Sequence, residues 1–472
     1  MTRDLIYSII GGIVVAVATV SAGHALLTKR DPRAALGWIS ACVLFPLVGP
    51  MFYFAFGINR IRMRAQKLVA TGADSSSGRI ADVPPAAGVP PELTQLERVG
   101  RSLTGAPLSA GNRVELLHNG EAAFPAMLAA IEAAREEIVL ATYIFETNDT
   151  GRRFVDALAA ARDRGVRVLV LVDGIGELYS FPWVTRLLRK RSVRTLRFLP
   201  PRLLPPRLQI NLRNHRKVLV VDGETAFTGG MNIGDRYLAE QSENPRRVVD
   251  VHARVTGPVV EQLRRAFADD WRWLSGEQLP SIRPSRERMG AASCRVIADG
   301  PSEDLEKIAM LLMAAISVAT RRVCIMTPYF LPPRSLVTAL QAAALRGVEV
   351  RVILPEKNNL PYVHWATRKM LWELLGRGVH VFLQPPPFVH TKLFRIDDDY
   401  VLLGSANIDP RSLRLNFELA LEAYDAELAA DVGRHFDAVV ARSREVTLQE
   451  MDDRSTIAKV RDAVAWLASP YL

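Results

Sequence analysis

Residues 214–222 read Asn-His-Arg-Lys-Val-Leu-Val-Val-Asp, and the same spacing returns at residues 389–397 as Val-His-Thr-Lys-Leu-Phe-Arg-Ile-Asp. Both stretches contain the pattern His-x-Lys-x4-Asp. The agreement continues past the motif, because a glycine follows each aspartate by seven residues and an asparagine follows it by ten. The matched residues are His215 and His390, Lys217 and Lys392, Asp222 and Asp397, Gly229 and Gly404, and Asn232 and Asn407. Identities in one register at all of these places predict a duplicated site.

Each motif is expected to lie on a β-strand. Side chains two residues apart on a strand face the same side, so each histidine projects together with its lysine. The aspartates stand at an odd offset, and Asp222 is followed by Gly223, where the strand should turn. Asp222 and Asp397 are candidate catalytic residues as members of the motif, but we expect a structural role for them.

Size and composition limit the kind of protein. A chain of 472 residues can form two or three domains, each with its own core. A hydrophobic content of 49% with 7% aromatic residues is typical of a globular protein with additional apolar segments. The formal charge of +10 favours anionic partners, either phospholipid surfaces or nucleic acid, and does not choose between them. Cys42, Cys294 and Cys324 are too few and too scattered for a disulfide framework or a cysteine zinc site, which is compatible with a reducing compartment.

Two apolar runs open the chain, at residues 5–27 and 34–57. At about 1.5 Å per residue, a helix over the first run can cross a hydrocarbon layer of ~30 Å. A short charged turn at residues 29–33 joins the runs, so residues 1–64 are expected to form a transmembrane helical hairpin with both ends on one side. A cleaved signal peptide is the alternative for the first run, with Val20-Ser21-Ala22 as the cleavage site. The length of the run and the second apolar run that follows disfavour it.

Basic residues near the apolar runs predict their orientation. Five of them flank the two ends and three lie in the turn: Arg3, Arg60, Arg62, Arg64 and Lys67 against Lys29, Arg30 and Arg33. This excess favours a multi-pass protein of the plasma or inner membrane with its remaining domains in the cytoplasm. Pro46 and Pro50 should kink the second span, which a membrane helix tolerates.

The rest of the chain divides into two similar parts. Residues 65–92, rich in Gly, Ser, Ala and Pro, are expected to form a flexible linker. Residues 93–276 form the first predicted domain, residues 277–293 a second linker and residues 294–472 the second domain. In each domain a helix, a strand, a helix ended by glycine and a second strand follow in the same order. These elements are expected at 121–136, 138–145, 152–164 and 166–172, and again at 305–319, 323–330, 335–346 and 348–354.

This order predicts the α/β class. Strands that alternate with helices form a largely parallel or mixed sheet with helices packed on its faces. Two duplicated units most simply pack about a pseudo-twofold axis, and such an axis could bring His215 and His390 to one cleft.

The paired residues suit phosphodiester transfer. That reaction needs a nucleophile, an acid for the departing alkoxide, and cations or donors for the non-bridging oxygens. One histidine must be neutral to attack phosphorus and the other protonated, and both forms are accessible near neutral pH. Lys217 and Lys392 can neutralise the phosphate, while Asn232 and Asn407 can donate to it. No metal or other cofactor is required.

Each histidine also needs a carboxylate that holds its tautomer. We expect Glu418, in Asn416-Phe417-Glu418-Leu419, behind His390, and Asp250, in Val249-Asp250-Val251, as its counterpart in the first half. A carboxylate in an apolar strand needs a partner, which leaves a pairing with some other basic residue as the alternative. The remaining histidines show no matching neighbourhood and are expected to be structural or on the surface: His24, His118, His252, His364, His380 and His435.

Around these residues the chain resembles the phospholipase D superfamily and, within it, the bacterial cardiolipin synthases. The resemblance includes the motif regions at 211–217, 228–234 and 390–392, and it extends to Gly404-Ser405-Ala406-Asn407-Ile408-Asp409-Pro410-Arg411-Ser412 and 416–418. In the apolar hairpin, Ala35-Leu36-Gly37-Trp38 and residues 45–50 are also similar to those enzymes. The departure lies before Asp250, where the family usually has Trp-Arg-Asp and this chain has Val248-Val249-Asp250.

The resemblance implies two duplicated phospholipase D-like domains and a membrane-bound phosphatidyltransferase. One phosphatidylglycerol would give its phosphatidyl group to a histidine and release glycerol, and the hydroxyl of a second phosphatidylglycerol would take that group to form cardiolipin. By analogy His215 is the nucleophile, and His390 is the acid and then the base. The partners are therefore anionic phospholipid and the membrane, with no nucleic acid. The sequence does not set the oligomeric state.

A hydrolase that releases phosphatidic acid is the main alternative, because water can attack the same intermediate unless it is excluded.

Phe198 to Leu208, which interleaves apolar and basic residues ahead of the first motif, is expected to rest on the lipid surface or else to be an ordinary proline-rich loop. In the first case Arg202 and Arg207 contact headgroups, and Leu203 and Leu204 lie deeper.

Three further classes of protein fit less well. A nuclease of the superfamily would have little use for two membrane spans, and no basic stripe interleaved with aromatics is evident. A membrane scaffold would not require the matched histidines, lysines and asparagines. A zinc hydrolase lacks ligands at the usual spacing.

Overall fold

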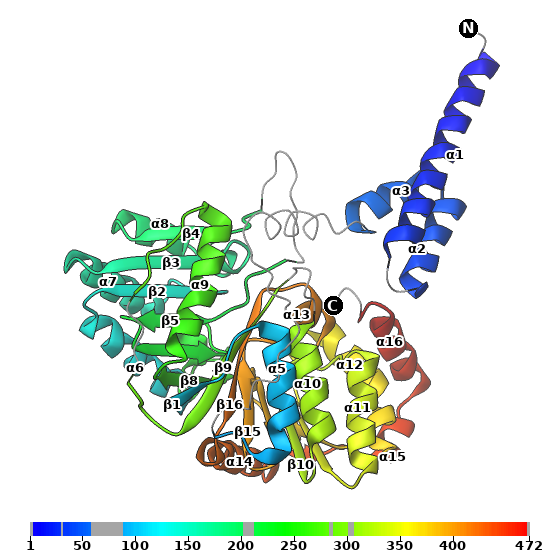
Figure 1. Cartoon of the computed structure of the whole chain (residues 1–472). Helices are drawn as coiled ribbons and strands as arrows, with labels where there is room; N and C mark the ends of the chain where they lie inside the picture. Colours follow the sequence, from blue (N-terminus) through cyan, green and yellow to red (C-terminus); the bar gives the residue numbers. More distant parts are fainter. Residues whose placement is uncertain are drawn as a thin grey trace. The chain divides into compact units, whose positions relative to one another are not determined.

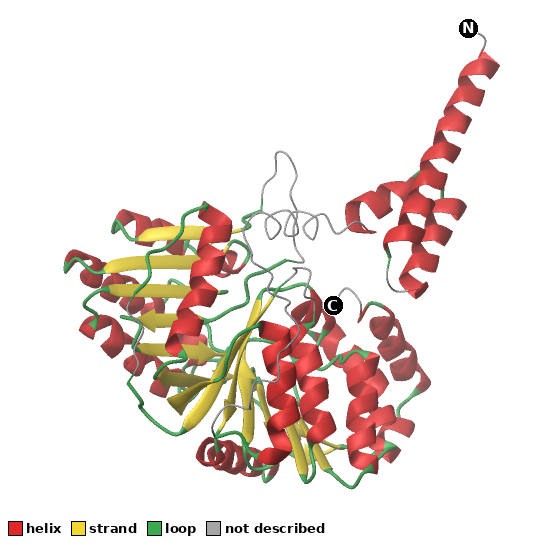
Figure 2. Ribbon diagram, viewed as in Figure 1, coloured by secondary structure: helices red, strands yellow, loops and turns green. Residues whose placement is uncertain are grey.

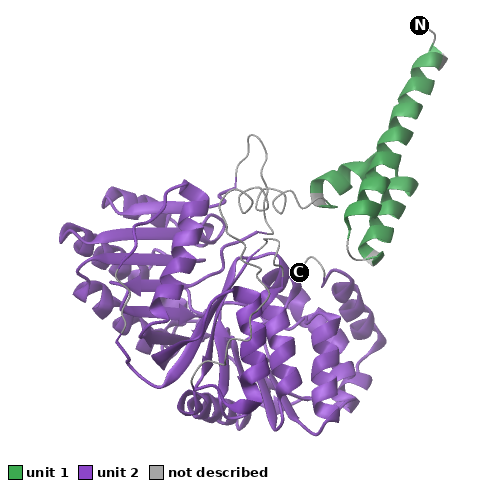
Figure 3. Cartoon of the chain, viewed as in Figure 1, with its two compact units in different colours: residues 1–73 green, residues 74–472 purple. Residues whose placement is uncertain are grey.

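The computed structural model describes residues 3–29, 32–57, 88–201, 212–282, 287–300 and 306–469. The chain separates into two compact units, residues 1–73 and 74–472 (Figure 3). Most of the linker expected at 65–92 lies outside the described residues. So do Arg202, Leu203, Leu204 and Arg207 of the predicted lipid-contacting loop.

The N-terminal unit contains one helix with the length and composition of a membrane span. This is α1 (Arg3–Thr28), whose residues 5–28 have a mean hydropathy of 2.2. The second predicted span is not one continuous helix. In the described residues it is divided into α2 (Pro32–Leu44), α3 (Val48–Phe52) and the π-helical turn η1 (Tyr53–Gly57). Helix α2 ends before Phe45-Pro46, because the residue preceding a proline is disfavoured in the helical conformation.

Residues 74–472 are built on one mixed sheet of 15 strands (Figures 1 and 2). The strands lie in the order β17-β12-β11-β10-β14-β15-β16-β9-β1-β8-β6-β5-β2-β3-β4. The first half contributes β1 (Ser109–His118), β2 (Glu137–Thr142), β3 (Arg167–Asp173), β4 (Arg194–Phe198), β5 (Val218–Val221), β6 (Thr225–Gly229) and β8 (Val251–Thr256). The second half contributes β9 (Ala292–Asp299), β10 (Arg322–Met326), β11 (Glu349–Pro355), β12 (His380–Gln384), β14 (Leu393–Ile396), β15 (Tyr400–Gly404), β16 (Glu418–Tyr424) and β17 (Arg444–Glu445).

The strand order makes the duplication visible. Apart from the edge strand β17, the order read outward from β1 in the first half repeats in the second half outward from β9. In each half the two outer pairs of strands are parallel and the remaining neighbours are antiparallel. Strands β1 and β9 pair antiparallel at the centre, so the two α/β units share one sheet. The duplicated mixed α/β fold expected from the sequence is therefore confirmed.

Helices cover both faces of the sheet (Figure 2). The first half carries η2 (Pro91–Leu93), α5 (Thr94–Thr104), α6 (Asn119–Ala133), α7 (Asp149–Asp163), η3 (Gly176–Tyr179), α8 (Val184–Lys190), η4 (Asp235–Tyr237) and α9 (Val260–Ser275). The second half carries α10 (Lys307–Val318), α11 (Arg334–Leu345), α12 (Pro361–Leu375), α13 (Pro410–Arg414), α14 (Ala426–Val440), α15 (Leu448–Asp452) and α16 (Thr456–Leu467). Side chains from α9 and α14 share one core cluster that spans both halves and joins them.

The helices and strands predicted from periodicity are confirmed with shifts of a few residues. Two of the predicted helix ends have a clear cause, because Gly165 and Gly347 adopt positive φ angles of 90° and 89° just after α7 and α11. Such angles are readily available only to glycine. Helix α5, in contrast, belongs to the first half by sequence but packs against α10 of the second half.

Candidate active site

Each motif histidine lies beside the strand that carries the other half's carboxylate. The backbone N–H of His215 donates to the carbonyl of Phe417 at 2.9 Å, one residue before Glu418. The backbone N–H of His390 donates to the carbonyl of Val249 at 2.8 Å, one residue before Asp250. The second contact extends the parallel pairing of β13 (Phe388–Val389) with β7 (Val248–Val249). Two equivalent contacts between the halves thus hold the two histidines.

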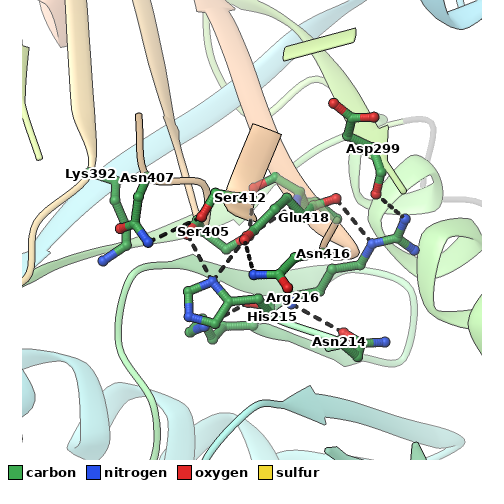
Figure 4. Close-up of polar contacts among 12 residues, drawn as sticks. Asn214, His215, Arg216, Asp299, Lys392, Ser405, Asn407, Ser412, Asn416 and Glu418 are labelled. Atoms are coloured by element: carbon green, nitrogen blue, oxygen red, sulfur yellow. Dashed lines mark hydrogen bonds and ion pairs between the residues drawn. The ribbon is translucent and has the colours of Figure 1, made fainter. Parts of the chain in front are cut away.

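The side chain of His215 is fixed by acceptors from the second half (Figure 4). Its Nδ1 lies 3.0 Å from Glu418 Oε2 and 3.1 Å from the carbonyl oxygen of Ser405. A carbonyl oxygen only accepts hydrogen bonds, so Nδ1 carries the proton. In the neutral ring Nε2 therefore keeps its lone pair, as a nucleophile requires.

His390 has the equivalent contact with the first half. Its Nδ1 lies 2.8 Å from Asp250 Oδ2. The predicted assignment of Glu418 to His390 and of Asp250 to the first half's histidine is therefore wrong. The histidines and lysines lie just before β5 and β14 and not, as the sequence predicts, on a strand. These preceding segments pair across the junction between the halves, Asn214 with Phe417 and β13 with β7, so each carboxylate serves the histidine of the opposite repeat.

The two carboxylates have different surroundings. Glu418 also accepts from Ser405 Oγ at 2.5 Å and from Asn416 Nδ2 at 3.2 Å, while Asp250 Oδ1 accepts from the backbone N–H of Val251 at 2.8 Å. Gly230 takes the place that corresponds to Ser405. A Cβ there would lie 2.5 Å from Asp250 Oδ1, so only glycine fits beside this carboxylate.

These surroundings shift the pKa values of the two carboxylates in opposite directions. Burial acts to raise the pKa of Glu418, but His215, Lys217 and Ser405 lower it below its usual value. Burial raises the pKa of Asp250 to about 6, against the opposing effect of Lys392. Glu418 is therefore firmly ionised at neutral pH, whereas Asp250 titrates just below it.

The histidines and lysines share one electrostatic environment. Burial lowers the pKa of His215, with Glu418 opposing the shift, and burial together with Lys392 and Lys217 lowers the pKa of His390 well below its ordinary value. Burial lowers the pKa of Lys392 to about 8 and that of Lys217 well below its usual value. Both histidines line one cavity, and His215 adds to the lowering of the pKa of His390, so their titrations are coupled.

Lys217 and Lys392 are buried next to their histidines. Lys217 Nζ donates to the carbonyl of His215 at 2.6 Å, and Lys392 Nζ donates to the carbonyl of His390 at 2.5 Å. The ammonium of Lys217 also lies 5.6 Å from the centre of the Tyr143 ring. Both cations are therefore held in fixed positions behind the histidines.

Asn232 and Asn407 line the same cavity as the histidines. Asn232 Nδ2 donates to the hydroxyl of Tyr237 at 2.8 Å, and Asn407 Nδ2 donates to Ser412 Oγ at 3.1 Å. Each amide nitrogen carries a second hydrogen, so these contacts leave one donor on each side chain for a ligand.

Asp222 and Asp397 lie at the far ends of their motif strands. Asp222 accepts from the backbone N–H groups of Arg135, Glu136 and Glu137 at 2.8 to 2.9 Å. Asp397 accepts from three consecutive backbone N–H groups, at residues 320–322, at 2.7 to 2.9 Å. Among the described residues neither lines the cavity with the histidines, and both fix the chain entering the adjacent strand.

The histidines open into one cavity of about 850 Å³ between the halves. Its lining is basic and aromatic. The cationic lining residues are Arg213, Arg236, Arg246, Arg247, Lys357 and Arg411, and the tyrosines are Tyr143, Tyr179, Tyr237, Tyr329 and Tyr362. In the part of the chain that the structure describes, Asp409 is the one acidic residue in this lining. The positive charge of this lining therefore suits an anionic ligand.

Sequence reasoning missed most of this lining. Arg236 and Arg411 could have been found, since each follows its half's asparagine by four residues. Tyr143, edge-on to His215 at 5.2 Å, and Tyr237, edge-on to His390 at 6.3 Å, carry no comparable signal.

A buried network stiffens the segment that leads into β5. Arg216 donates to Asp270 Oδ1 at 2.6 Å, to the carbonyl of Glu418 at 3.1 Å and to that of Asp299 at 3.0 Å. Asn214 Nδ2 donates to Asp270 Oδ2 at 2.8 Å. The second motif has Val389 and Thr391 at these places, so His215 rests on the more rigid support.

The sequence matches known protein families and relatives over most of its length. The family described as "Cardiolipin synthase, PLD-like domain" matches residues 127–271 and 312–440, and "Phospholipase_D-nuclease N-terminal" matches residues 13–57. The chain is 34% identical over 469 residues to cardiolipin synthase A of Pseudomonas putida strain KT2440, covering 98% of this chain and 97% of that one. It is 35% identical over 463 residues to cardiolipin synthase A of Pseudomonas aeruginosa strain LESB58, covering 96% and 94%.

A solved structure has the same fold. The phosphatidylserine synthase of Haemophilus influenzae Rd KW20 superimposes with a TM-score of 0.61 at 16% identity, covering 80% of this chain and all of that one.

Proposed function

Since this chain belongs to the cardiolipin synthase family of phospholipase D-like phosphatidyltransferases, we propose that it transfers a phosphatidyl group from one phosphatidylglycerol to another. The products are cardiolipin and glycerol. The observation that carries this proposal is the cavity lined by both His215 and His390, each held at Nδ1 by a carboxylate from the opposite half. Such a pair supplies a nucleophile for phosphorus and a proton donor for the oxygen that leaves it.

The first step forms a phosphohistidine. The Nε2 lone pair of His215 attacks phosphorus, the bond from phosphorus to the glycerol oxygen breaks, and His390 Nε2 gives its proton to that oxygen. Glu418 stabilises the positive charge that develops on His215. Lys217 and Lys392, with the free amide hydrogens of Asn232 and Asn407, stabilise the charge on the non-bridging oxygens.

Substrate binding allows His390 to take up the proton that it needs from solution. In the free enzyme burial and the two lysines lower the pKa of this histidine. The negative phosphodiester opposes the lysines, so its binding raises the pKa of His390 and takes up a proton.

The second step regenerates the enzyme. A glycerol hydroxyl of the second phosphatidylglycerol gives its proton to His390, its oxygen attacks phosphorus, and the bond from phosphorus to Nε2 of His215 breaks. Water would give phosphatidic acid instead. The basic rim supports the lipid acceptor, because it attracts a second anionic headgroup to the place where a hydroxyl is needed.

The cellular setting is part of the proposal. Residues 1–64 form a membrane hairpin in the plasma or inner membrane with both ends in the cytoplasm, residues 65–92 act as a tether, and residues 93–276 and 294–472 are the two catalytic domains. The first apolar helix and the match of residues 13–57 to an N-terminal family support it. The tether would keep the cavity within reach of lipid headgroups.

The test is to incubate the detergent-solubilised full chain with phosphatidylglycerol and EDTA and to identify the products. Cardiolipin with an equal amount of glycerol supports the proposal, phosphatidic acid identifies a hydrolase, and no turnover points to a scaffold. Radiolabelled phosphatidyl should become attached to the wild type and not to His215→Ala. The matched control is His380→Ala, because His380 is half exposed on β12 and pairs with Glu445. Label on His215→Ala would exclude His215 as the nucleophile.

A further inference from the structure

Helix α16 has its apolar side chains on the outside. Ile457, Val460, Val464 and Leu467 follow the spacing i, i+3, i+7, i+10, which places them on one face of the helix. Their exposed fractions are 84%, 57%, 62% and 71%. A surface helix of a soluble domain normally has the opposite arrangement, with this stripe turned toward the core.

The inner face of α16 consists of one buried carboxylate and small side chains, of which Ala465 packs against the core. Asp462 is fully buried and accepts from Arg454 at 2.6 Å and from Arg461 at 2.7 Å, with Arg368 of α12 at 4.0 Å. These contacts attach α16 to the domain without its apolar stripe. Within the part of the chain that the structure describes, the stripe is therefore left uncovered.

A second stripe lies on the neighbouring helix. Tyr362, Trp365, Lys369 and Trp372 follow the same spacing along α12, and Tyr362 and Trp372 are 43% and 51% exposed. Helices α12 and α16 pack side by side (Figure 1). The guanidinium of Arg461, which follows Val460 in the chain, lies 4.7 Å from the centre of the Trp365 ring and so connects α16 to the α12 stripe.

This surface leads to the active-site cavity. Leu360, Tyr362 and Val363, at the start of α12, all line the cavity that contains the two histidines. We call the surface made by Tyr362, Trp365 and Trp372 with the α16 stripe the α12–α16 face. Its aromatic end is thus the cavity rim, and its aliphatic part lies on α16.

We propose that the α12–α16 face lies on the surface of an anionic phospholipid bilayer, with the α16 stripe among the upper parts of the acyl chains. The inference rests on the proposed function, because a substrate whose chains stay in the bilayer must enter a cavity whose rim adjoins lipid. The composition fits this occupant. Tryptophan and tyrosine favour the membrane interface, and Lys369 and Arg461 beside them suit anionic headgroups.

A second copy of the chain is the other possible occupant, and a label on α16 separates the two. Val460→Cys and Val464→Cys are labelled with an environment-sensitive fluorophore in the full chain, reconstituted in vesicles containing phosphatidylglycerol. The native Cys42, Cys294 and Cys324 are buried. The control is Leu345→Cys at the end of α11, which is 68% exposed outside the face. Lipids with a nitroxide on the acyl chain should quench the label at 460 and 464 but not at 345.

Each other result overturns the inference. Labels at 460 and 464 that stay in water exclude lipid contact, and labels protected from water but crosslinked between chains identify a second copy. This readout does not depend on turnover. If the protein made no cardiolipin, the proposed function would fail while the position of α16 would still be measured.

A charge variant provides an independent test. Val460→Asp with Val464→Asp should raise the apparent KM for phosphatidylglycerol diluted in vesicles severalfold and leave kcat unchanged, with no effect on a monomeric short-chain phosphatidylglycerol. Leu345→Asp should change neither. An unchanged KM in vesicles, or an equal loss on both substrates, contradicts the proposal.

Discussion

Removing the charge of either carboxylate should slow the transfer, but each variant should impair a different histidine. Glu418→Gln removes the negative charge 3.0 Å from Nδ1 of His215, and Asp250→Asn removes the charge 2.8 Å from Nδ1 of His390. Opposite unit charges 3 Å apart interact by about 5 kcal/mol at an effective dielectric constant of about 20. Allowing for the hydrogen bond that the amide can still accept, each variant should lose roughly 3 to 5 kcal/mol of transition-state stabilisation. This corresponds to about 10²- to 10⁴-fold in kcat/KM.

The leaving group separates the two effects. A phosphatidyl ester of p-nitrophenol releases a phenolate that needs no proton, so the first step no longer depends on His390. With this substrate Asp250→Asn should recover a fast burst of p-nitrophenolate, because the attack by His215 is intact. Glu418→Gln should remain slow, since its nucleophile is impaired.

Stopped-flow absorbance of the burst, with circular dichroism to check folding, measures both variants. Rescue of Glu418→Gln and not of Asp250→Asn would refute the assignment, because that pattern requires His390 as the nucleophile. Equal rescue of both variants would show that the two carboxylates do not act on separate histidines.

Three more outcomes follow from the site. The kcat/KM profile should fall below about pH 6, where Asp250 gains a proton; Asp250→Asn should remove this acid limb from the remaining activity, and a variant that keeps the limb would assign it to another group. Gly230→Ala should cut kcat at least tenfold, because its Cβ displaces the Asp250 carboxylate, whereas Gly165→Ala should lower only the melting temperature, having no atom within 4 Å of its Cβ. Asp222→Ala should destabilise the fold by about 1 to 3 kcal/mol in urea unfolding through lost backbone caps; a loss of activity without a loss of stability would instead give Asp222 a catalytic part.

Local patterns were enough to predict the α/β class, the duplication and the main helices and strands, because periodicity and glycine stops are properties of short segments. They also identified His215 and His390 as the candidate catalytic histidines. The partner of each histidine could not be predicted in this way. The pairing of Asn214 with Phe417, and of Phe388 with Val248, depends on how two domains meet, and no local pattern records it. The cavity rim was missed for the same reason, since Tyr143 and Tyr237 acquire their places only in the assembled fold.

The exchange of carboxylates bears on how such a chain could have arisen. Asp250 serves His390 and Glu418 serves His215, so an ancestor with a single copy of the unit would have had no complete dyad of its own. It would have worked only as a homodimer, in which each subunit completed the other. Fusion of two gene copies would then have made that partnership permanent and allowed the copies to diverge, as the serine at 405 and the glycine at 230 illustrate.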